Sequence, residues 1–324
     1  MKKWHGIWGK VASLLLALQF LLAGCGLSQG TGSKPSPSPK AGTQAVTPIK
    51  PPAHEATLVQ KVDGPLKITM LSVGKADSIL IQVDKKNYLV DTGLFEDGNT
   101  LVARLRKLGV NSLDGLFLTH PHKDHIGGAV AILNSLHVEH VYYTNVVNPQ
   151  SGLMKKVKKL IEDKHIDAVL VTAPMDIPLK NGASFKVFWP EKDHLTVPGD
   201  TNVNPNSMVM RFTYQDFTMM FTGDAYTQTE AKIMSLYDAK ELKSDVLKVG
   251  HHSSNTSSSM NWLRTVKPMV AVISCGNEPG TRKYPNKTVL KRLKTAGAKI
   301  YNTYDNGDIT IISNGSEYAV TTEK

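Results

Sequence analysis

Four side chains that commonly bind metals stand within six positions of this chain: His120, His122, Asp124 and His125. They follow a short apolar run, Leu116–Leu118, that is typical of a buried strand, and they precede an apolar segment, Ala129–Leu136, that is typical of a helix. The first two histidines are two residues apart, so an extended segment points both side chains the same way. The aspartate and the last histidine lie where the chain turns into the helix, and they can face a second point nearby.

Imidazole nitrogen combined with carboxylate oxygen suits Zn²⁺, and also Mn²⁺ or Fe²⁺. Surface loops also collect histidines that bind nothing, but four ligand types between a strand and a helix favour a metal site. Two ligand groups facing two nearby points indicate a dinuclear centre. We therefore expect two divalent ions, Zn²⁺ or Mn²⁺, as cofactors.

Two later segments place further candidate ligands at the ends of expected strands. Asp224 follows the strand Phe217–Phe221, where its carboxylate could either cap the next helix or reach a metal. His251 and His252 follow the apolar run Val246–Val249. Because neighbouring side chains point in different directions, one histidine would bind the metal and the other would contact substrate. The spacing leaves open which does which.

The pattern His-x-His-x-Asp-His resembles the signature of the metallo-β-lactamase superfamily. Further segments, in the same order, resemble the metallo-β-lactamase-like domain of ComEC-type competence DNA-uptake channels, and the likeness extends from about Leu66 to Gly315. This resemblance implies an α/β fold, an αββα sandwich of two sheets with helices outside, as a single catalytic domain over residues 64–324. Periodicity alone indicates only the α/β class. The segments that carry the resemblance are Val73–Ile81, Asp91–Gly93, Asn206–Ser207, Thr222–Asp224 and Leu247–Ser253.

The resemblance also implies a ligand set for two positions, metal 1 and metal 2, with Asp224 bridging them. Two aspartates at strand ends, Asp77 and Asp91, would lie behind the ligands. Asp91 would hold a ligand histidine in one tautomer, or would simply be a turn carboxylate. Metal 2 would be held by Asp124, His125, Asp224 and His251, and metal 1 by His120, His122 and Asp224.

One expected ligand is missing from this sequence. The superfamily pattern places a third metal 1 histidine just before the strand Ser207–Thr213, but the chain has asparagines there. Metal 1 then has only three protein ligands, or the amide oxygen of Asn206 or Asn204 completes it. We expect metal 1 to bind more weakly than metal 2.

The resemblance implies a nuclease or phosphodiesterase that uses a hydroxide held by two metals. The residues alone imply only metal-assisted hydrolysis. Lys248, His252 and the hydroxyl groups of residues 253–259 could hold a phosphoryl oxygen of DNA or another phosphodiester. The set predicted to carry the chemistry is Asp124, Asp224, His252 and Lys248.

Two other functions remain open from the sequence. The first is hydrolysis of a β-lactam or another small ester or amide, although the missing histidine counts against it. The second is a non-catalytic DNA-binding lipoprotein with structural metal. The bridging aspartate counts against that function, because structural zinc sites are usually closed and mononuclear.

The first residues resemble a lipoprotein signal peptide. Three lysines precede the apolar stretch Val11–Ala23, which is short for a spanning helix, and Leu22–Cys25 resembles a bacterial lipobox. We expect residues 1–24 to be removed and Cys25 to be lipidated. The protein would then be anchored to the cell membrane on its extracytoplasmic side.

Residues 25–63 contain a run rich in serine, proline and lysine that cannot bury apolar surface, which indicates a flexible linker. Seven of the 38 basic residues and two of the 28 acidic residues precede Gly64, so the globular part is only mildly basic. This charge permits an anionic partner without requiring one. The second cysteine, Cys275, follows an apolar run and is expected to be a small buried residue, so a disulfide framework is excluded. We predict no protein partner.

Overall fold

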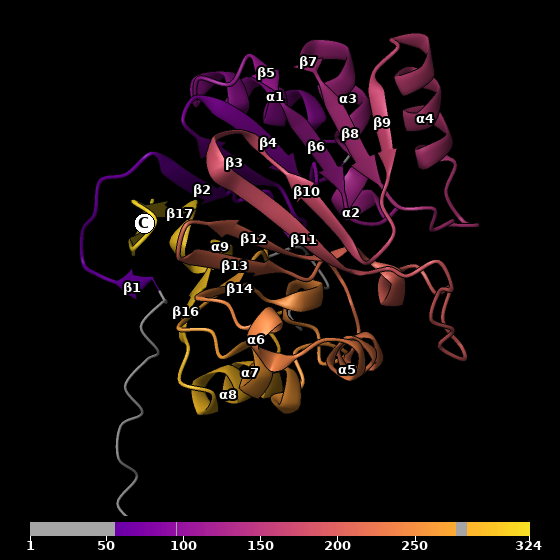
Figure 1. The fold of residues 1–324 in the computed structure, drawn as a ribbon. Helices are drawn as coiled ribbons and strands as arrows, with labels where there is room; N and C mark the ends of the chain where they lie inside the picture. The colour runs from indigo at the N-terminus through magenta and orange to yellow at the C-terminus, as the bar shows by residue number, and fades with distance from the viewer. Residues whose placement is uncertain (1–55, 95, 277–283) are drawn as a thin grey trace, which may run out of the picture. The chain divides into compact units, whose positions relative to one another are not determined.

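Two β-sheets lie face to face, and helices cover the outer side of each (Figure 1). This arrangement comes from a computed structural model, which describes residues 56–94, 96–276 and 284–324. It is the αββα sandwich that the resemblance implied, and it belongs to the α/β class that periodicity indicated. The predicted signal peptide, the lipidation site Cys25 and most of the predicted linker lie outside the described residues. No helix within the described residues is long and apolar enough to cross a membrane.

The first sheet combines an antiparallel half with a parallel half. Strands β2, β3 and β4 form a meander with short turns, whereas β4, β6, β8 and β9 run parallel and alternate with helices. In spatial order its strands are β1 (Thr57–Leu58), β18 (Glu317–Thr322), β17 (Ile309–Ser313), β2 (Leu66–Met70), β3 (Ile79–Val83), β4 (Lys86–Val90), β6 (Gly115–Leu118), β8 (His140–Tyr143) and β9 (Asp167–Leu170).

The second sheet has the same division into an antiparallel and a parallel half. Strands β10 to β13 pair antiparallel, and β13 to β16 pair parallel. In spatial order its strands are β10 (Met175–Pro178), β11 (Ala183–Trp189), β12 (Val209–Tyr214), β13 (Phe217–Phe221), β14 (Val246–Lys248), β15 (Val270–Ile273) and β16 (Lys299–Asn302). A separate small ladder joins β5 (Ser112–Leu113) to β7 (His137–Val138).

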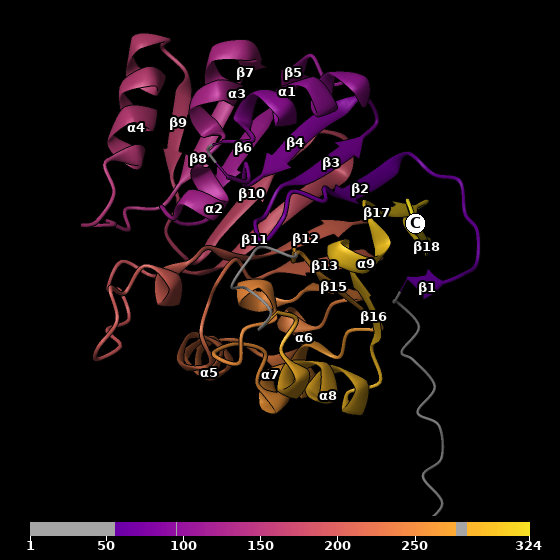
Figure 2. The same cartoon turned by 180° about the vertical axis from the view of Figure 1, so that it is seen from behind.

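The helices form the two outer layers, and Figure 2 shows the same layers from behind. Those of the first layer pack on the first sheet, and those from α5 to α8 pack on the second. Their bounds are α1 (Gly98–Lys107), α2 (Lys123–Ile126), α3 (Ala129–Ser135), α4 (Leu153–Asp163), α5 (Thr227–Leu236), α6 (Ala239–Leu242), α7 (Met260–Val266), α8 (Lys287–Thr295) and α9 (Thr303–Asn306).

Alternation along the strands produces three packed layers of side chains. In β3, Ile79 and Ile81 face the other sheet, whereas Leu80 faces the helices of the first layer. The central layer is built around Phe185, whose ring lies 4.7 Å from that of Phe117 and 5.4 Å from that of Phe212. Removing such a buried ring typically costs about 3–5 kcal/mol. Cys275 is buried as predicted.

One element differs from the sequence prediction. β1 lies before residue 64, so the final part of the predicted linker pairs with β18. Two other parts of the sheets have weak sequence signals. The segment 137–143 divides into β7 and β8, which pair with different neighbours. β10 is a short edge strand that ends in proline, a residue that weakens a strand pattern.

Candidate metal centre

Four loops meet where parallel strands of both sheets end. β4 leads into Asp91, β6 into the loop 119–128 that contains α2, β13 into Asp224, and β14 into the short 3₁₀ helix Gly250–Ser253. β4 pairs parallel with β6, and β13 pairs parallel with β14, so each pair releases its loops at one edge of its sheet. The carboxyl ends of parallel strands are the usual place for a site in α/β proteins.

Backbone contacts hold the histidine loop against the loop after β4. The Thr92 N–H donates to the His125 carbonyl at 2.6 Å, and the Gly127 N–H donates to the Gly93 carbonyl at 3.0 Å. A Cβ atom on Gly128 would collide with the carbonyl oxygen of Thr92, so this close approach requires glycine. The local sequence therefore fixes where the histidines point.

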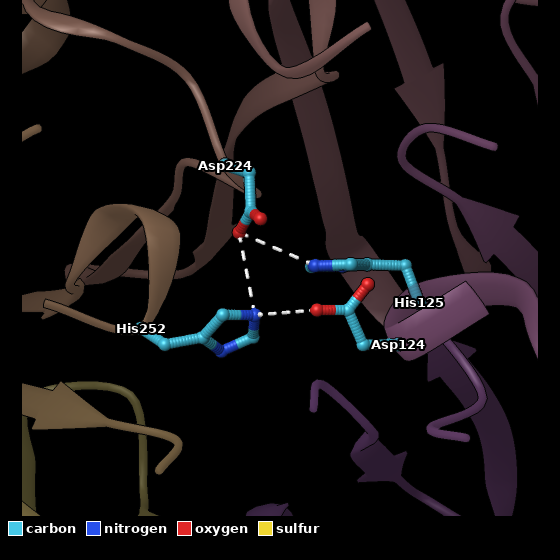
Figure 3. A group of neighbouring side chains, drawn as sticks. All are labelled: Asp124, His125, Asp224 and His252. Carbon is cyan, nitrogen blue, oxygen red and sulfur yellow. Dashed lines mark ion pairs between the residues drawn. The ribbon is translucent and has the colours of Figure 1, made fainter. Parts of the chain in front are cut away.

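One group of ligand atoms converges where these loops meet, and we call it the inner subsite (Figure 3). Nε2 of His252 lies 3.5 Å from Oδ2 of Asp124 and 3.6 Å from Oδ1 of Asp224. Nε2 of His125 lies 3.2 Å from the same Oδ1 of Asp224. The inner subsite consists of Asp124, His125, Asp224 and His252, whose ligand atoms all lie within 4.8 Å of one another.

The inner subsite has the chemistry of a cation site. Nε2 of His125, Nε2 of His252 and Oδ1 of Asp224 are buried and have no hydrogen-bond partner. Buried polar atoms are nearly always satisfied, so unsatisfied atoms facing one point require an explanation. A divalent metal ion among these nitrogen and oxygen atoms would satisfy all three.

His252, and not His251, occupies the inner subsite, which corrects the assignment of His251 to metal 2. The reason lies in the backbone, because His251, His252 and Ser253 have φ angles of 49°, 51° and 70°. Three successive left-handed residues, unusual for side chains with a Cβ, turn the two rings toward different places. The centroids of the two histidine rings are 6.3 Å apart.

The second oxygen of Asp224 faces a different set of histidines, which we call the outer subsite. Oδ2 lies 3.9 Å from Nε2 of His120 and 3.7 Å from Nε2 of His251. Nε2 of His120 is also 3.2 Å from Nδ1 of His122. These three imidazoles are candidate ligands for a second ion, with His251 in place of the histidine that the sequence lacks. In the described residues, however, their ligand atoms do not form a group within 4.8 Å as those of the inner subsite do.

The two asparagines considered for metal 1 have different roles. Both polar atoms of the Asn206 amide are occupied: Oδ1 accepts from the Leu195 N–H at 2.9 Å, and Nδ2 donates to the carbonyls of Leu195 and Asn202. Asn206 therefore shapes its own loop, and its assignment as a ligand was wrong. Asn204 faces the outer subsite, with Nδ2 3.4 Å from Nε2 of His251 and Oδ1 buried without a partner.

The inner histidines are held from behind by protein oxygen atoms. Asp91 places Oδ2 2.7 Å from Nδ1 of His125, and its Oδ1 accepts from the Thr119 N–H at 2.9 Å. Nδ1 of His252 donates to the carbonyl of Ser274 at 3.1 Å. Both contacts put the ring proton on Nδ1 and leave Nε2 free for a metal, the arrangement that supports metal-ligating histidines in general.

Lys248 does not reach substrate, contrary to its predicted catalytic role. The side chain is 1% exposed, and its ammonium lies 2.8 Å from Oδ2 of Asp77 and donates to the Val249 carbonyl at 2.9 Å. Asp77 in turn lies behind both inner histidines, 3.8 Å from Nδ1 of His125 and 3.7 Å from Nδ1 of His252. Burial raises the pKa of Asp77, but Lys248 and the two histidines outweigh burial and hold it below its usual value.

The hydroxyl-rich segment 253–259 also forms hydrogen bonds mainly with other parts of the protein. The Ser257 hydroxyl donates to the carbonyl of Ala225 at 2.7 Å, and the N–H of Ser259 donates to the buried carboxylate of Glu230 at 2.8 Å. The hydroxyl of Thr256 contacts Nδ1 of His251 at 2.8 Å. This segment therefore positions His251 rather than offering a row of donors to a phosphate.

The ionisation of most ligands suits metal binding. His125 is the exception: burial lowers its pKa, but Asp224 and Asp91 outweigh burial and hold that pKa well above its usual value, so a metal ion must displace a proton there. Burial would raise the pKa of Asp224, but the neighbouring histidines outweigh it and hold that pKa well below the usual range. Burial also raises the pKa of Asp124, and contact with His252 reverses this and holds it well below normal. Burial lowers the pKa of His120 and His251, so both are neutral at neutral pH. Anionic carboxylates and neutral imidazoles are the forms that bind metals.

Two residues at the mouth of the site were missed from the sequence. Nζ of Lys75 lies 3.8 Å from Oδ2 of Asp124 and 5.0 Å from the ring centroid of Tyr284. The ring of Tyr226 stacks on His251 at 5.6 Å, and its hydroxyl donates to Asp200 at 2.8 Å. The only sequence signals were the turn before Asp77 for Lys75 and, for Tyr226, a position two residues after Asp224.

The chain belongs to the metallo-beta-lactamase superfamily, whose model matches residues 71–276. The matched segment contains every residue of the inner and outer subsites. The fold is accordingly similar to that of CmlA, a diiron beta-hydroxylase from Streptomyces venezuelae, with a TM-score of 0.52 and 12% identity over 78% of this chain and 55% of that one.

Three of the relatives are competence proteins of the ComEC type, which confirms the resemblance predicted from the sequence. ComE operon protein 3 of Bacillus subtilis is 26% identical over 264 residues, covering 75% of this chain and 32% of the relative. Recombination protein 2 of Haemophilus influenzae is 30% identical over 250 residues, covering 76% and 28%. This chain therefore spans about a third of the length of these curated relatives.

Proposed function

We propose that this protein is a two-metal phosphodiesterase that cleaves DNA on the outer side of the cytoplasmic membrane. The observation that carries the proposal is the orientation of Asp224. Its Oδ1 faces His125 and His252, whereas its Oδ2 faces His120 and His251. A single carboxylate between two sets of imidazoles is the geometry that bridges two ions, and such sites catalyse in-line displacement at phosphorus.

Divalent ions bound at the two subsites would supply Lewis acidity, which lowers the pKa of water and neutralises charge on a phosphoryl oxygen. The chain holds the ligands in position for that chemistry. Asp91 and the Ser274 carbonyl orient the inner histidines, and the ion pair between Lys248 and Asp77 lies directly behind them.

Substrate would meet a cation and two polar side chains at the mouth. The Lys75 ammonium is close to Asp124 and partly exposed, so it can contact a phosphate oxygen. Tyr226 and Asn204 border the outer subsite, where they can orient the group next to the scissile bond.

The names of the relatives favour DNA over a small ester or amide. Two of them are described as a competence protein and a recombination protein. They are several times longer than the matched segment, so DNA as the substrate of this chain remains our proposal. A β-lactam or another small ester or amide is the alternative.

A direct test uses the purified chain, stripped of metal and reloaded with Mn²⁺ or Zn²⁺. It is incubated with single-stranded DNA, double-stranded DNA, bis-p-nitrophenyl phosphate and nitrocefin, beside Asp224→Asn and a matched control, Asp216→Asn, in an exposed turn. We expect metal-dependent loss of DNA and of bis-p-nitrophenyl phosphate with the wild type and the control only. Turnover of nitrocefin alone would assign the protein to the small-molecule hydrolases. Metal and DNA binding without any turnover would indicate a non-catalytic binding module.

The membrane anchor is a separate part of the proposal. Its support is the lipobox-like sequence that ends at Cys25. In bacteria expressing the full chain, the wild type should fractionate with membranes and incorporate labelled fatty acid, whereas Cys25→Ala should do neither. Equal fractionation of the two proteins would remove the anchor from the proposal and leave the hydrolase untouched.

A further inference from the structure

A groove opens beside the metal centre, along α4. It encloses about 480 Å³ between α4 and the chain that leads into that helix. Val147, which is 74% exposed, and the partly buried Met154 supply an apolar surface. Lysines of α4 form one wall. We define the α4 groove by Val146, Val147, Met154, Lys155, Lys158 and Lys159.

The inner end of the α4 groove adjoins the histidine loop. Asn148, which also lines the groove, donates through Nδ2 to the carbonyl of Pro121 at 3.0 Å. Pro121 lies between two outer-subsite ligands, His120 and His122. Val146 and Met154 also lie near His120 and Pro121, around a gap too small to hold water. A molecule whose reacting phosphate lies at the metals can therefore extend into the groove.

Three lysines and one carboxylate, that of Glu162, line the groove, and this net positive charge fits a chain of phosphates. Lys155 and Lys158 are exposed and lie three residues apart, on one face of the helix. The described residues contain no ion pair of either lysine with a carboxylate, whereas Lys159 is paired with Asp163 at 3.0 Å. Lys158 also lies over the ring of Tyr143, 4.9 Å from its centroid.

We propose that the α4 groove binds single-stranded DNA next to the phosphodiester that is cut. The lysines would contact the backbone, and the apolar surface of Val147 and Met154 would contact unpaired bases. The bases of a duplex are stacked inside it and cannot contact that apolar surface. Sites for single strands, in contrast, combine cations with apolar platforms on which bases stack. This inference rests on the proposed function and adds to it the form of DNA and the path of the strand.

The test compares two double variants with the same change in charge. Lys155→Gln/Lys158→Gln alters the groove, and Lys291→Gln/Lys294→Gln alters exposed positions of α8, which packs on the other sheet. Binding of a fluorescein-labelled oligo-dT to the metal-free proteins is followed by anisotropy at several salt concentrations. The groove variant should bind at least about fivefold more weakly, and the slope of log K against log salt should fall by about 0.7 for each lysine. The α8 variant should match the wild type.

Two further measurements make the inference specific. Val147→Ser should weaken binding of the single strand without changing the salt slope, and a blunt duplex should bind less well than the single strand. Equal losses in both double variants, or equal binding of duplex and single strand, would overturn the inference.

Cleavage by the wild type separates this inference from the proposed function. If the wild type cleaves DNA but the groove variant binds normally, the groove assignment fails and the phosphodiesterase stands. If the groove variant loses binding while the wild type cleaves no phosphodiester, the proposed activity fails and the groove stands.

Discussion

The inner and outer subsites share Asp224 but differ in burial and in what supports their ligands. In the inner subsite His125 and His252 are fully buried, and their Nδ1 atoms meet a carboxylate and a carbonyl. In the outer subsite His122 and His251 are partly exposed, and His251 is held by the hydroxyl of Thr256. Support by charged or carbonyl oxygens inside the protein preorganises ligands more strongly than support by an exposed hydroxyl. We therefore expect the inner ion to bind more tightly and the outer ion to exchange.

The largest effect should come from the residue that the subsites share. Asp224→Asn removes the charge between them, so both ions should be weakened and hydrolysis should fall by more than about a hundredfold, since even partners behind metal ligands cost 10–100-fold. Metal content by mass spectrometry and phosphodiester turnover are the measurements, with Asp216→Asn as the control. Retention of both ions with full turnover would rule out a bridging role.

Replacing either His251 or His252 should affect only one of the two subsites. His252→Ala should remove the inner ion, and His251→Ala the outer one, because each imidazole faces a different oxygen of Asp224. Titration of the metal-free variants with Co²⁺, followed by visible absorption, reports each site without needing activity. We expect each variant to bind one equivalent, with His251→Ala keeping the tighter one. Loss of the tighter equivalent in His251→Ala would reverse the assignment.

The strands and the ligand types could be predicted from the sequence, but the assignment of each histidine to the inner or the outer subsite could not. Apolar runs ended at the observed positions for β6 and β13, because burial on both faces leaves a continuous signal. The ligand positions followed from a compact motif at a strand end. The placement of His251 and His252 depends on their own left-handed backbone angles. No residue pattern predicts such angles at non-glycine residues.

The roles of Lys248 and Asn206 show the same limit of sequence reasoning. A lysine just before a histidine pair suggests contact with phosphate. Instead, the Lys248 ammonium forms an ion pair with Asp77, about 170 positions earlier in the chain. The Asn206 amide forms hydrogen bonds with the backbone N–H and carbonyl of Leu195. Asp77 is distant in sequence from Lys248, and Leu195 lies eleven positions before Asn206 in an irregular segment, so only the fold shows either contact.

The ion pair behind the inner subsite should matter for stability, whereas the exposed cation should matter for substrate. Lys248→Met leaves the buried Asp77 carboxylate without its ammonium, and breaking a buried pair in this way costs about 3–5 kcal/mol. Lys75→Met, at the partly exposed mouth, should change the free energy of unfolding by less than about 1 kcal/mol and raise KM for a phosphodiester. Urea unfolding and steady-state kinetics on both variants test the contrast. Equal stability losses would contradict it.

Asp91→Asn should lower the affinity for the inner ion only, which tests the difference between the two subsites. The change removes the charge that holds Nδ1 of His125, so we expect the affinity for the inner ion to fall about 10–100-fold. A chelating dye in competition with the protein measures this. Asp167→Asn is a matched control, because Asp167 contacts Nδ1 of His140 at the same distance, 2.7 Å, on the exposed surface. A similar loss in the control would show that the effect is not local.

The smallest effect is expected at the support of the outer subsite. The Thr256 hydroxyl lies 2.8 Å from Nδ1 of His251, and Thr256 itself is exposed, so water can replace the contact when it is removed. Thr256→Val should therefore weaken the outer ion by less than about tenfold and leave the inner ion unchanged, and Thr256→Ser should restore the wild-type affinity. Co²⁺ titration of both variants, with Thr321→Val as a control on another exposed hydroxyl, measures the difference. A loss as large as that of Asp91→Asn would mean that the outer ligands are as firmly held as the inner ones.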